Sequence, residues 1–209
     1  MIGAMSEHSW PDYYAVTVDR PAWHTVTEAI ALFAAEDVAA GEATAEPRLA
    51  VDLGCGAGRD ARELLRNGWR VLAIDTEHDA VDALQAATEA SDLPRLQTLV
   101  ADIGSFILPP CDLVNASVSF QFLEPAAYAR TFAQIASALN KGGRFCGLLY
   151  GDRDEAAADP AYTCPSPDQI RGWLAAFEIE SWNEREEDGT MALGDPHHIH
   201  LVEVVARRL

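Results

Sequence analysis

Three glycines within five residues interrupt the chain between an apolar run and a helical pattern. Residues 49–53 are mostly apolar, and the segment 54–58 (Gly-Cys-Gly-Ala-Gly) follows them directly. In residues 59–67 leucine and alanine recur at helical spacing, and Gly68 stands where such a helix would end. Because glycine has no Cβ, this strand-to-helix turn predicts a place where a ligand approaches the backbone closely. The alternative is a tight turn that binds nothing.

Apolar runs and helical periods alternate along the next part of the chain. Further strands are expected at residues 69–74, 96–101, 112–117 and 144–150, helices at 28–40, 77–90 and 126–139, and a turn at 141–143. This alternation predicts βαβ units, and therefore a doubly wound α/β fold with a parallel sheet between two layers of helices.

The pattern changes after Gly151. A helix is expected at residues 168–176, followed by strands at 177–183 and 198–206 that a polar loop connects. Two closing strands without a crossover helix favour an antiparallel pair at the edge of the sheet. A length of 209 residues suits one domain. We expect a single domain over 1–209, with N-terminal cap helices in 1–46, a ligand-binding core in 47–150 and a substrate-side part in 151–209.

Composition excludes several classes of partner. The net charge is −18 and Lys141 is the only lysine, so a nucleic-acid substrate is not expected. No run of 18 uncharged apolar residues occurs, and the first ten residues lack the layout of a secretory signal. The four cysteines are widely spaced without a CxxC pair, which indicates free thiols, no bound metal and a cytoplasmic location.

Two positions distinguish between kinds of nucleotide ligand. A dinucleotide-binding loop has glycine or alanine as its sixth residue, whereas this loop has Arg59 there. Asp75 ends the second expected strand, where a carboxylate can accept hydrogen bonds from both ribose hydroxyls. Asp102 ends the third expected strand, where its carboxylate can accept a hydrogen bond from an adenine amino group. The alternatives are a solvated aspartate at Asp75 and a capping residue at Asp102.

Together these segments resemble the class I S-adenosylmethionine-dependent methyltransferases. Segment 51–58 (Val-Asp-Leu-Gly-Cys-Gly-Ala-Gly) looks like motif I of that family, and Asp75 in 71–75 matches its ribose-binding acid. Segment 100–103 resembles the adenine-contacting segment, 111–116 the fourth strand, and 139–145 the turn before the fifth strand. The resemblance implies a Rossmann-like sheet of seven strands, the last of them antiparallel and inserted next to the fifth.

The resemblance also implies S-adenosylmethionine as the cofactor. Its methionine end would lie over the glycine turn, its ribose at Asp75, and its adenine between Thr76 and Ile103. The residues expected to bind it are Tyr14, Asp52, Gly54, Cys55, Gly56, Asp75, Thr76, Asp102, Ile103 and Asn115. Tyr14 belongs to an N-terminal segment, with Tyr13 and Arg20, that resembles the cofactor-capping segment of small-molecule methyltransferases.

A methyl acceptor would approach the ends of the fourth and fifth strands. Methyl transfer requires mainly alignment and exclusion of water, so the sequence need not contain a recognisable catalytic residue, and none is assigned. The substrate-side candidates are Trp23, Phe120, Gln121, Tyr150, Arg153 and His198. The alternatives are core packing for Phe120 and a solvated charge for Arg153. His198 and His200 would lie on the same face of a strand. For such a pair, a position at the surface is commoner than a metal site.

The predicted function is methyl transfer to a small molecule. The familiar signature of nitrogen methylation, Asp or Asn followed by Pro-Pro-Tyr or Pro-Pro-Phe, is absent after the fourth strand, where segment 115–118 (Asn-Ala-Ser-Val) stands instead. Two alternatives stay open at this point. One is a cofactor-binding regulatory protein without catalysis, and the other is an NAD-dependent oxidoreductase, which Arg59 disfavours.

Overall fold

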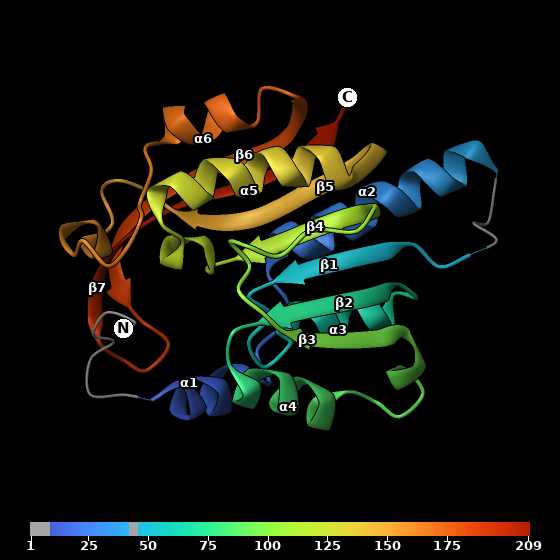
Figure 1. Ribbon diagram of the computed structural model, residues 1–209, viewed down its shortest axis with the longest axis horizontal. Coiled ribbons are helices and arrows are strands. Elements are labelled where there is room, and N and C mark those ends of the chain that lie inside the picture. Colours follow the sequence, from blue (N-terminus) through green and yellow to red (C-terminus); the bar gives the residue numbers. More distant parts are fainter. Residues whose placement is uncertain (1–8, 42–45) are drawn as a thin grey trace.

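A seven-stranded sheet runs through the computed structural model, which describes residues 9–41 and 46–209 (Figure 1). The strands are β1 (Leu49–Leu53), β2 (Arg70–Asp75), β3 (Leu96–Val100), β4 (Cys111–Ser117), β5 (Leu139–Tyr150), β6 (Phe177–Thr190) and β7 (Pro196–Arg208). Their order is β3-β2-β1-β4-β5-β7-β6, with β7 antiparallel to both of its neighbours and the first five strands parallel. The predicted fold class is confirmed, including the insertion of the last strand beside the fifth.

Helices cover both faces of this sheet. They are α1 (Trp10–Thr17), α2 (His24–Ala40), α3 (Arg59–Arg66), α4 (His78–Ala87), α5 (Pro125–Ala138) and α6 (Pro167–Trp173), with short 3₁₀ turns η1 (Leu93–Arg95), η2 (Phe120–Phe122) and η3 (Glu155–Ala158). One buried cluster joins α2, α3 and α4 to the sheet, and a second joins α5 and α6 to its other face. None of the helices in the described part of the chain combines the length and hydropathy of a membrane span.

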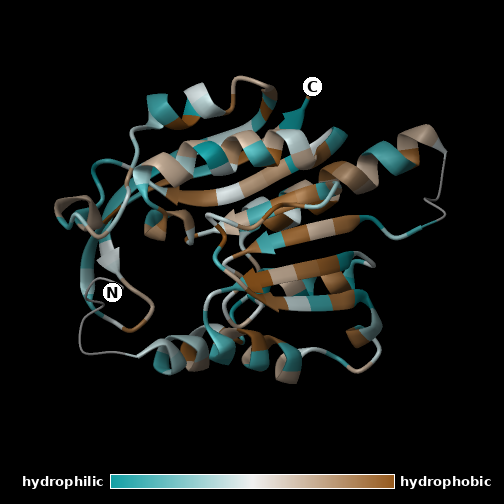
Figure 2. Cartoon of the chain, in the orientation of Figure 1, coloured by the Kyte–Doolittle hydropathy of each residue, from teal (hydrophilic) through white to brown (hydrophobic). Residues whose placement is uncertain are grey.

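The central strands are apolar because both of their faces are buried. On β1, Val51 and Leu53 enter the cluster beneath α5, whereas Ala50 enters the cluster beneath α2 and α3. Figure 2 shows the resulting hydrophobic residues along β1 and β2, whereas hydrophilic and hydrophobic residues alternate along the helices. Parallel strands that are covered on both faces have nearly continuous apolar sequences. For this reason these strands could be predicted from the sequence.

Several boundaries differ from the expected ones. Helix α2 begins four residues earlier than expected, at His24, and α4 ends at Ala87. The expected turn at residues 141–143 is part of β5, where a register shift opposite Cys111 accommodates Gly142 with its φ of 81°. Residues 1–8 and 42–45, which both fall in the expected N-terminal region 1–46, lie outside the described residues.

The largest difference is the length of the closing hairpin. Strands β6 and β7 continue to Thr190 and Pro196, so most of the expected polar loop is paired backbone, and the turn occupies only residues 191–195. The strand residues at this end of the hairpin are polar because they form ion pairs, among them Arg185 with Glu187 and His198 with Asp188. The hairpin brings residues near 191–197 to the carboxyl edge of the parallel strands.

One buried arginine fixes α2 against the sheet. The side chain of Arg144 on β5 is 1% exposed and forms ion pairs with Glu36 of α2 and Glu180 of β6, both at 2.7 Å. Its guanidinium also lies over the ring of Phe33, 4.4 Å from the centroid. Because α2 follows directly on Trp23, these contacts help to place the start of that helix at the functional edge.

Candidate active site

The glycine turn adopts a backbone that favours glycine at three positions. Gly54, Gly56 and Gly58 have φ values of 74°, 51° and 82°, in the left-handed region. The N–H groups of Gly54 and Cys55 both donate to the carbonyl oxygen of Ile74, at 2.8 and 3.0 Å, so the turn is fastened to β2.

Only one of these glycines opens toward free space. A Cβ at Gly54 would lie 2.3 Å from the Cβ of Ser119, and a Cβ at Gly58 would lie 2.1 Å from Leu84. Both positions are therefore glycine because neighbouring elements pack against them. A Cβ at Gly56 would meet only the Tyr14 ring, at 3.7 Å. Since Gly56 also lines the large cavity at this edge of the sheet, its bare backbone is the surface that a ligand would approach.

Asp75 holds the turn from the end of β2. Its Oδ2 accepts a hydrogen bond from the Gly56 N–H at 2.9 Å, and its Oδ1 accepts from the Glu77 N–H at 3.1 Å. A carboxylate has about four acceptor positions, so each oxygen keeps one for a ligand. Asp102 likewise accepts from the Gly104 N–H at 3.0 Å. It caps its own turn and also lines the cavity, so the capping role is observed and the ligand role stays a prediction.

Two buried carboxyl groups lie beneath the turn and share one amide. The Asn115 Nδ2 donates to Asp52 Oδ1 at 2.8 Å and to Asp60 Oδ2 at 3.1 Å, and the Trp23 N–H donates to Asp60 Oδ1 at 2.9 Å. The Oδ2 of Asp52 is buried without a partner among the described residues. Burial, and then the neighbouring Asp60 carboxylate, raise the pKa of Asp52 to about 8, and burial also raises the pKa of Asp60.

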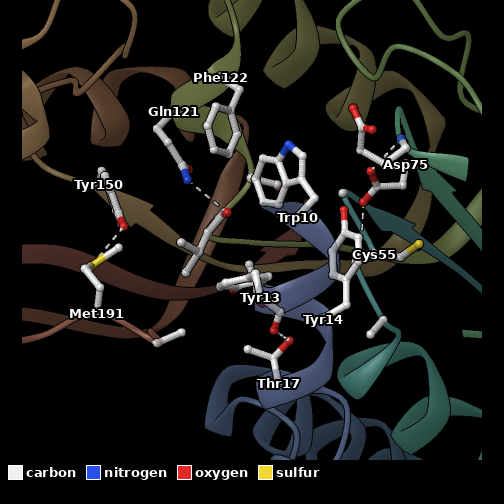
Figure 3. Close-up of a pocket in the computed structure, with 18 of the residues that line it drawn as sticks. Trp10, Tyr13, Tyr14, Thr17, Cys55, Asp75, Gln121, Phe122, Tyr150 and Met191 are labelled. Atoms are coloured by element: carbon white, nitrogen blue, oxygen red, sulfur yellow. Dashed lines mark hydrogen bonds between the residues drawn. The ribbon is translucent and has the colours of Figure 1, made fainter. Parts of the chain in front are cut away.

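Above these groups lies a cavity of about 590 Å³ (Figure 3). Helix α1 supplies Trp10, Tyr13 and Tyr14 to one wall, and Phe122 packs edge-on against Trp10 at 5.7 Å between centroids. The hairpin closes another side, where the Tyr150 hydroxyl lies 3.9 Å from the Met191 sulfur. The cavity therefore joins the glycine turn to residues from four distant parts of the chain.

A strained backbone marks the end of β4 inside this cavity. Val118 has a φ of 55°, which is rare for a β-branched residue, and no other described residue apart from glycine has a positive φ. Its N–H donates to the Leu148 carbonyl oxygen at 2.8 Å, which fixes it in this conformation. Strain of this kind concentrates at functional sites. No sequence signal identified Val118.

The structure gathers nearly all of the expected cofactor-binding residues. Those that line the cavity are Tyr14, Asp52, Gly54, Cys55, Gly56, Asp75, Thr76, Asp102 and Ile103. Asn115 does not line it, because it is fully buried below Asp52 and Asp60 and its side chain bridges them. That these residues contact the cofactor stays a prediction.

The substrate-side candidates divide into two groups. Trp23, Gln121 and Tyr150 line the cavity. Phe120 does not, since it is fully buried and packs on Tyr128, Phe132 and Phe145 in the core beneath α5. The expectation that Phe120 faces an acceptor is therefore wrong, whereas the neighbouring Phe122 lines the cavity.

Arg153 and His198 also lie outside the cavity lining. Arg153 forms ion pairs with Glu184 and Glu186, and the His198 Nδ1 lies 2.7 Å from a carboxylate oxygen of Asp188. Both expectations are corrected, because the extended β6 strand supplies carboxylates that hold these side chains. Within residues 9–41 and 46–209 no group of three side chains suits a metal ion.

Among the described histidines, His197 is the one that lines the cavity. Its Nε2 lies 2.7 Å from Asp154 Oδ1. Neighbouring residues of a strand point to opposite faces, so the register of β7 turns His197 toward the cavity and His198 away from it. The sequence contained both histidines but did not fix that register.

Comparison with known proteins gives a consistent result. Residues 50–143 match the family described as "Methyltransferase domain". A carboxy-S-adenosyl-L-methionine synthase of Psychrobacter sp. (strain PRwf-1) is 30% identical over 134 residues, which cover 59% of this chain and 49% of that protein. The chain thus spans about half the length of this curated relative.

Solved structures share the fold at low identity. TehB from Haemophilus influenzae superposes with a TM-score of 0.66 at 20% identity, covering 83% of this chain and 62% of that one. Magnesium protoporphyrin IX methyltransferase from Synechocystis PCC 6803 with bound SAM superposes with a TM-score of 0.61 at 16% identity, covering 100% and 88%.

Proposed function

We propose that this chain is a class I S-adenosylmethionine-dependent methyltransferase that methylates a small-molecule acceptor in the cavity above the glycine turn. One observation supports this most directly. Gly56 presents bare backbone to the cavity while Asp75 holds its N–H, so a nucleoside can lie against the turn with the carboxylate beside it.

The residues present fit S-adenosylmethionine, the cofactor of this family. The ligand carries a cationic sulfonium and an ammonium group, and the buried, unpartnered Oδ2 of Asp52 is suited to a cation. In our proposal Asp75 accepts hydrogen bonds from the ribose hydroxyls and Asp102 from the adenine amino group. Thr76 and Ile103 flank the adenine.

When bound, S-adenosylmethionine supplies a methyl group on a positively charged sulfur. The chain has to align the acceptor with that group and keep water out. The aromatic walls formed by Trp10, Tyr13 and Phe122 support exclusion of water, and the size of the cavity supports binding of both ligands side by side. The free cysteines of the described chain support a cytoplasmic location, and the net charge of −18 supports a small molecule over nucleic acid.

Calorimetry with S-adenosylhomocysteine, together with a methyl-transfer assay on a panel of metabolites, tests this proposal. We expect binding to the wild type and turnover of at least one acceptor. Gly56→Val should abolish binding, because its side chain would occupy the cavity. Gly41→Val is the matched control, since Gly41 also has a positive φ, 67°, but a Cβ placed there would meet no atom of the described residues within 4 Å.

Each contrary outcome has a distinct meaning. Binding without turnover of any acceptor would favour a regulatory protein. Normal binding by folded Gly56→Val protein would put the site elsewhere. Tight NADH binding without affinity for S-adenosylhomocysteine would refute the cofactor assignment.

A further inference from the structure

We propose that His197 is the general base of this enzyme, that Asp154 positions it, and that the acceptor is an uncharged aromatic molecule bearing a hydroxyl or thiol. This inference rests on the proposed methyl transfer. It is carried by a buried aspartate and a histidine that faces the cavity from the closing hairpin.

The carboxylate of Asp154 is held rigidly. Its side chain is 0% exposed, its Oδ1 accepts from the Ala156 N–H at 3.0 Å, and its Oδ2 accepts from the His200 N–H at 2.9 Å. The His197 Nε2 lies 2.7 Å from the same Oδ1. Since an ionised carboxylate only accepts hydrogen bonds, Nε2 of a neutral His197 must carry the proton.

That tautomer leaves the lone pair of Nδ1 free for a ligand. The His197 side chain is 14% exposed and belongs to the cavity lining. The other groups around it are the Glu155 carboxylate, 3.7 Å from Nδ1, and the Tyr150 ring, 6.3 Å between centroids. Burial raises the pKa of Tyr150, so its phenol stays neutral and does not compete as a base.

The charges that line the cavity indicate which acceptors fit. They include the carboxylate of Glu155, 3.7 Å from His197 Nδ1, and that of Asp159. In the described lining the only lysine or arginine is Arg59, whose Nε donates to the Pro21 carbonyl oxygen at 2.9 Å. An acceptor carrying a carboxylate or phosphate would therefore meet like charge without a free cation to pair with it.

The walls favour a flat apolar body. The rings of Trp10, Tyr13, Phe122, Tyr150 and Tyr162 all line the cavity, and Phe122 lies 5.6 Å from Tyr162 between centroids. The exposed faces and edges of such rings form an apolar wall against which another aromatic ring can pack.

Methyl transfer to such an acceptor needs no further reagent. The acceptor O–H or S–H bond breaks and its proton passes to Nδ1 of His197. The acceptor's electron pair forms the new bond to the methyl carbon, and the electrons of the old carbon–sulfur bond return to the sulfur, which becomes a neutral thioether. The proton on His197 then passes to water.

A comparison of phenol with thiophenol as acceptors distinguishes a general-base role of His197 from a structural one. In slightly alkaline buffer thiophenol is mostly ionised, whereas phenol is mostly neutral and needs a base. We expect the wild type to methylate both compounds, and 4-mercaptobenzoate much more slowly than thiophenol because of its carboxylate. His197→Gln should slow methylation of phenol by roughly 100- to 10,000-fold, and that of thiophenol by much less. His198→Gln, one residue away and held by Asp188 outside the cavity, is the matched control and should alter neither rate.

A second measurement identifies the tautomer of His197 and does not depend on catalytic turnover. Nitrogen-15 NMR of the wild type should show His197 protonated at Nε2, and Asp154→Asn should shift protons toward Nδ1 and slow methylation of phenol. Equal losses on both acceptors in His197→Gln, or protonation at Nδ1 in the wild type, would refute the assignment. Binding of S-adenosylhomocysteine without methylation of phenol or thiophenol would overturn this acceptor class alone, whereas loss of cofactor binding in the wild type would overturn the proposed function itself.

Discussion

The substitution Gly54→Ala separates packing of the glycine turn from ligand binding. Gly54 has a φ of 74°, and a Cβ at this position would lie 2.3 Å from the Cβ of Ser119. Ser119 cannot withdraw easily, because its hydroxyl donates to the Leu53 carbonyl oxygen at 2.7 Å. Either the end of β1 or the segment after β4 must shift.

The expected loss has two parts. A left-handed conformation costs a residue with a Cβ about 1–2 kcal/mol. Overpacking of a rigid site costs about 1–3 kcal/mol more. The sum is about 2–5 kcal/mol. For a domain of this size each kcal/mol lowers Tm by roughly 2–4 °C, so Gly54→Ala should lower Tm by roughly 4–20 °C.

Gly41→Ala and Gly56→Ala are the controls for this measurement. Gly41 has a φ of 67° and no described atom within 4 Å of an added Cβ, and Gly56 has a φ of 51° with only the Tyr14 ring at 3.7 Å. Both substitutions should lose only the stability that the left-handed backbone conformation costs, about 1–2 kcal/mol. Gly56→Ala should in addition weaken binding of S-adenosylhomocysteine. Thermal unfolding by circular dichroism gives the stabilities, and equal Tm values for the three variants would refute the assigned packing role of Gly54.

Other perturbations test the site and the core. Asp75→Ala should weaken S-adenosylhomocysteine binding by about 1–3 kcal/mol through lost charge-assisted hydrogen bonds, measured by calorimetry; an unchanged Kd would remove Asp75 from the site. Because burial raises the pKa of Asp52 from 3.8 to about 8, the folded protein keeps a proton that the unfolded chain has lost, so this group lowers stability as pH rises through that window. Ionised Asp52 should in turn bind the cationic cofactor better, so affinity should rise up to pH 8 in the wild type and less in Asp52→Asn; identical pH dependence would contradict this. Arg144→Met should cost about 2–3 kcal/mol in urea unfolding, since Glu36 and Glu180 lose their partner; a neutral effect would show that packing compensates.

The parallel part of the fold was predictable because its strands are buried on both faces. Apolar runs such as residues 49–53 identify these strands, and the glycine turn with Asp75 identifies one side of the cavity, where we propose that the cofactor binds. The closing hairpin was not predictable to its full length. Its outer half is polar, since ion pairs such as Arg185 with Glu187 replace apolar packing there.

The acceptor side was harder to predict because it depends on register and tertiary contacts. A shift of one residue in β7 exchanges His197 for His198 at the cavity. Phe120 and Phe122 are chemically alike, and only the geometry of η2 sends one to the core and the other to the cavity. Arg153 looks functional in isolation, but β6 supplies the carboxylates that pair with it.

The hairpin of β6 and β7 has a consequence for how the proposed activity could diversify. Most of the proposed cofactor contacts come from one continuous stretch, residues 52–103, whereas His197 and the 191–195 turn come from the far end of the chain. Because that turn projects beyond the sheet, its length and sequence can change while the paired strands stay in register. Exchange of residues 191–195 between related enzymes should therefore redirect acceptor choice and leave cofactor affinity intact, which makes this turn the first target for engineering new substrates.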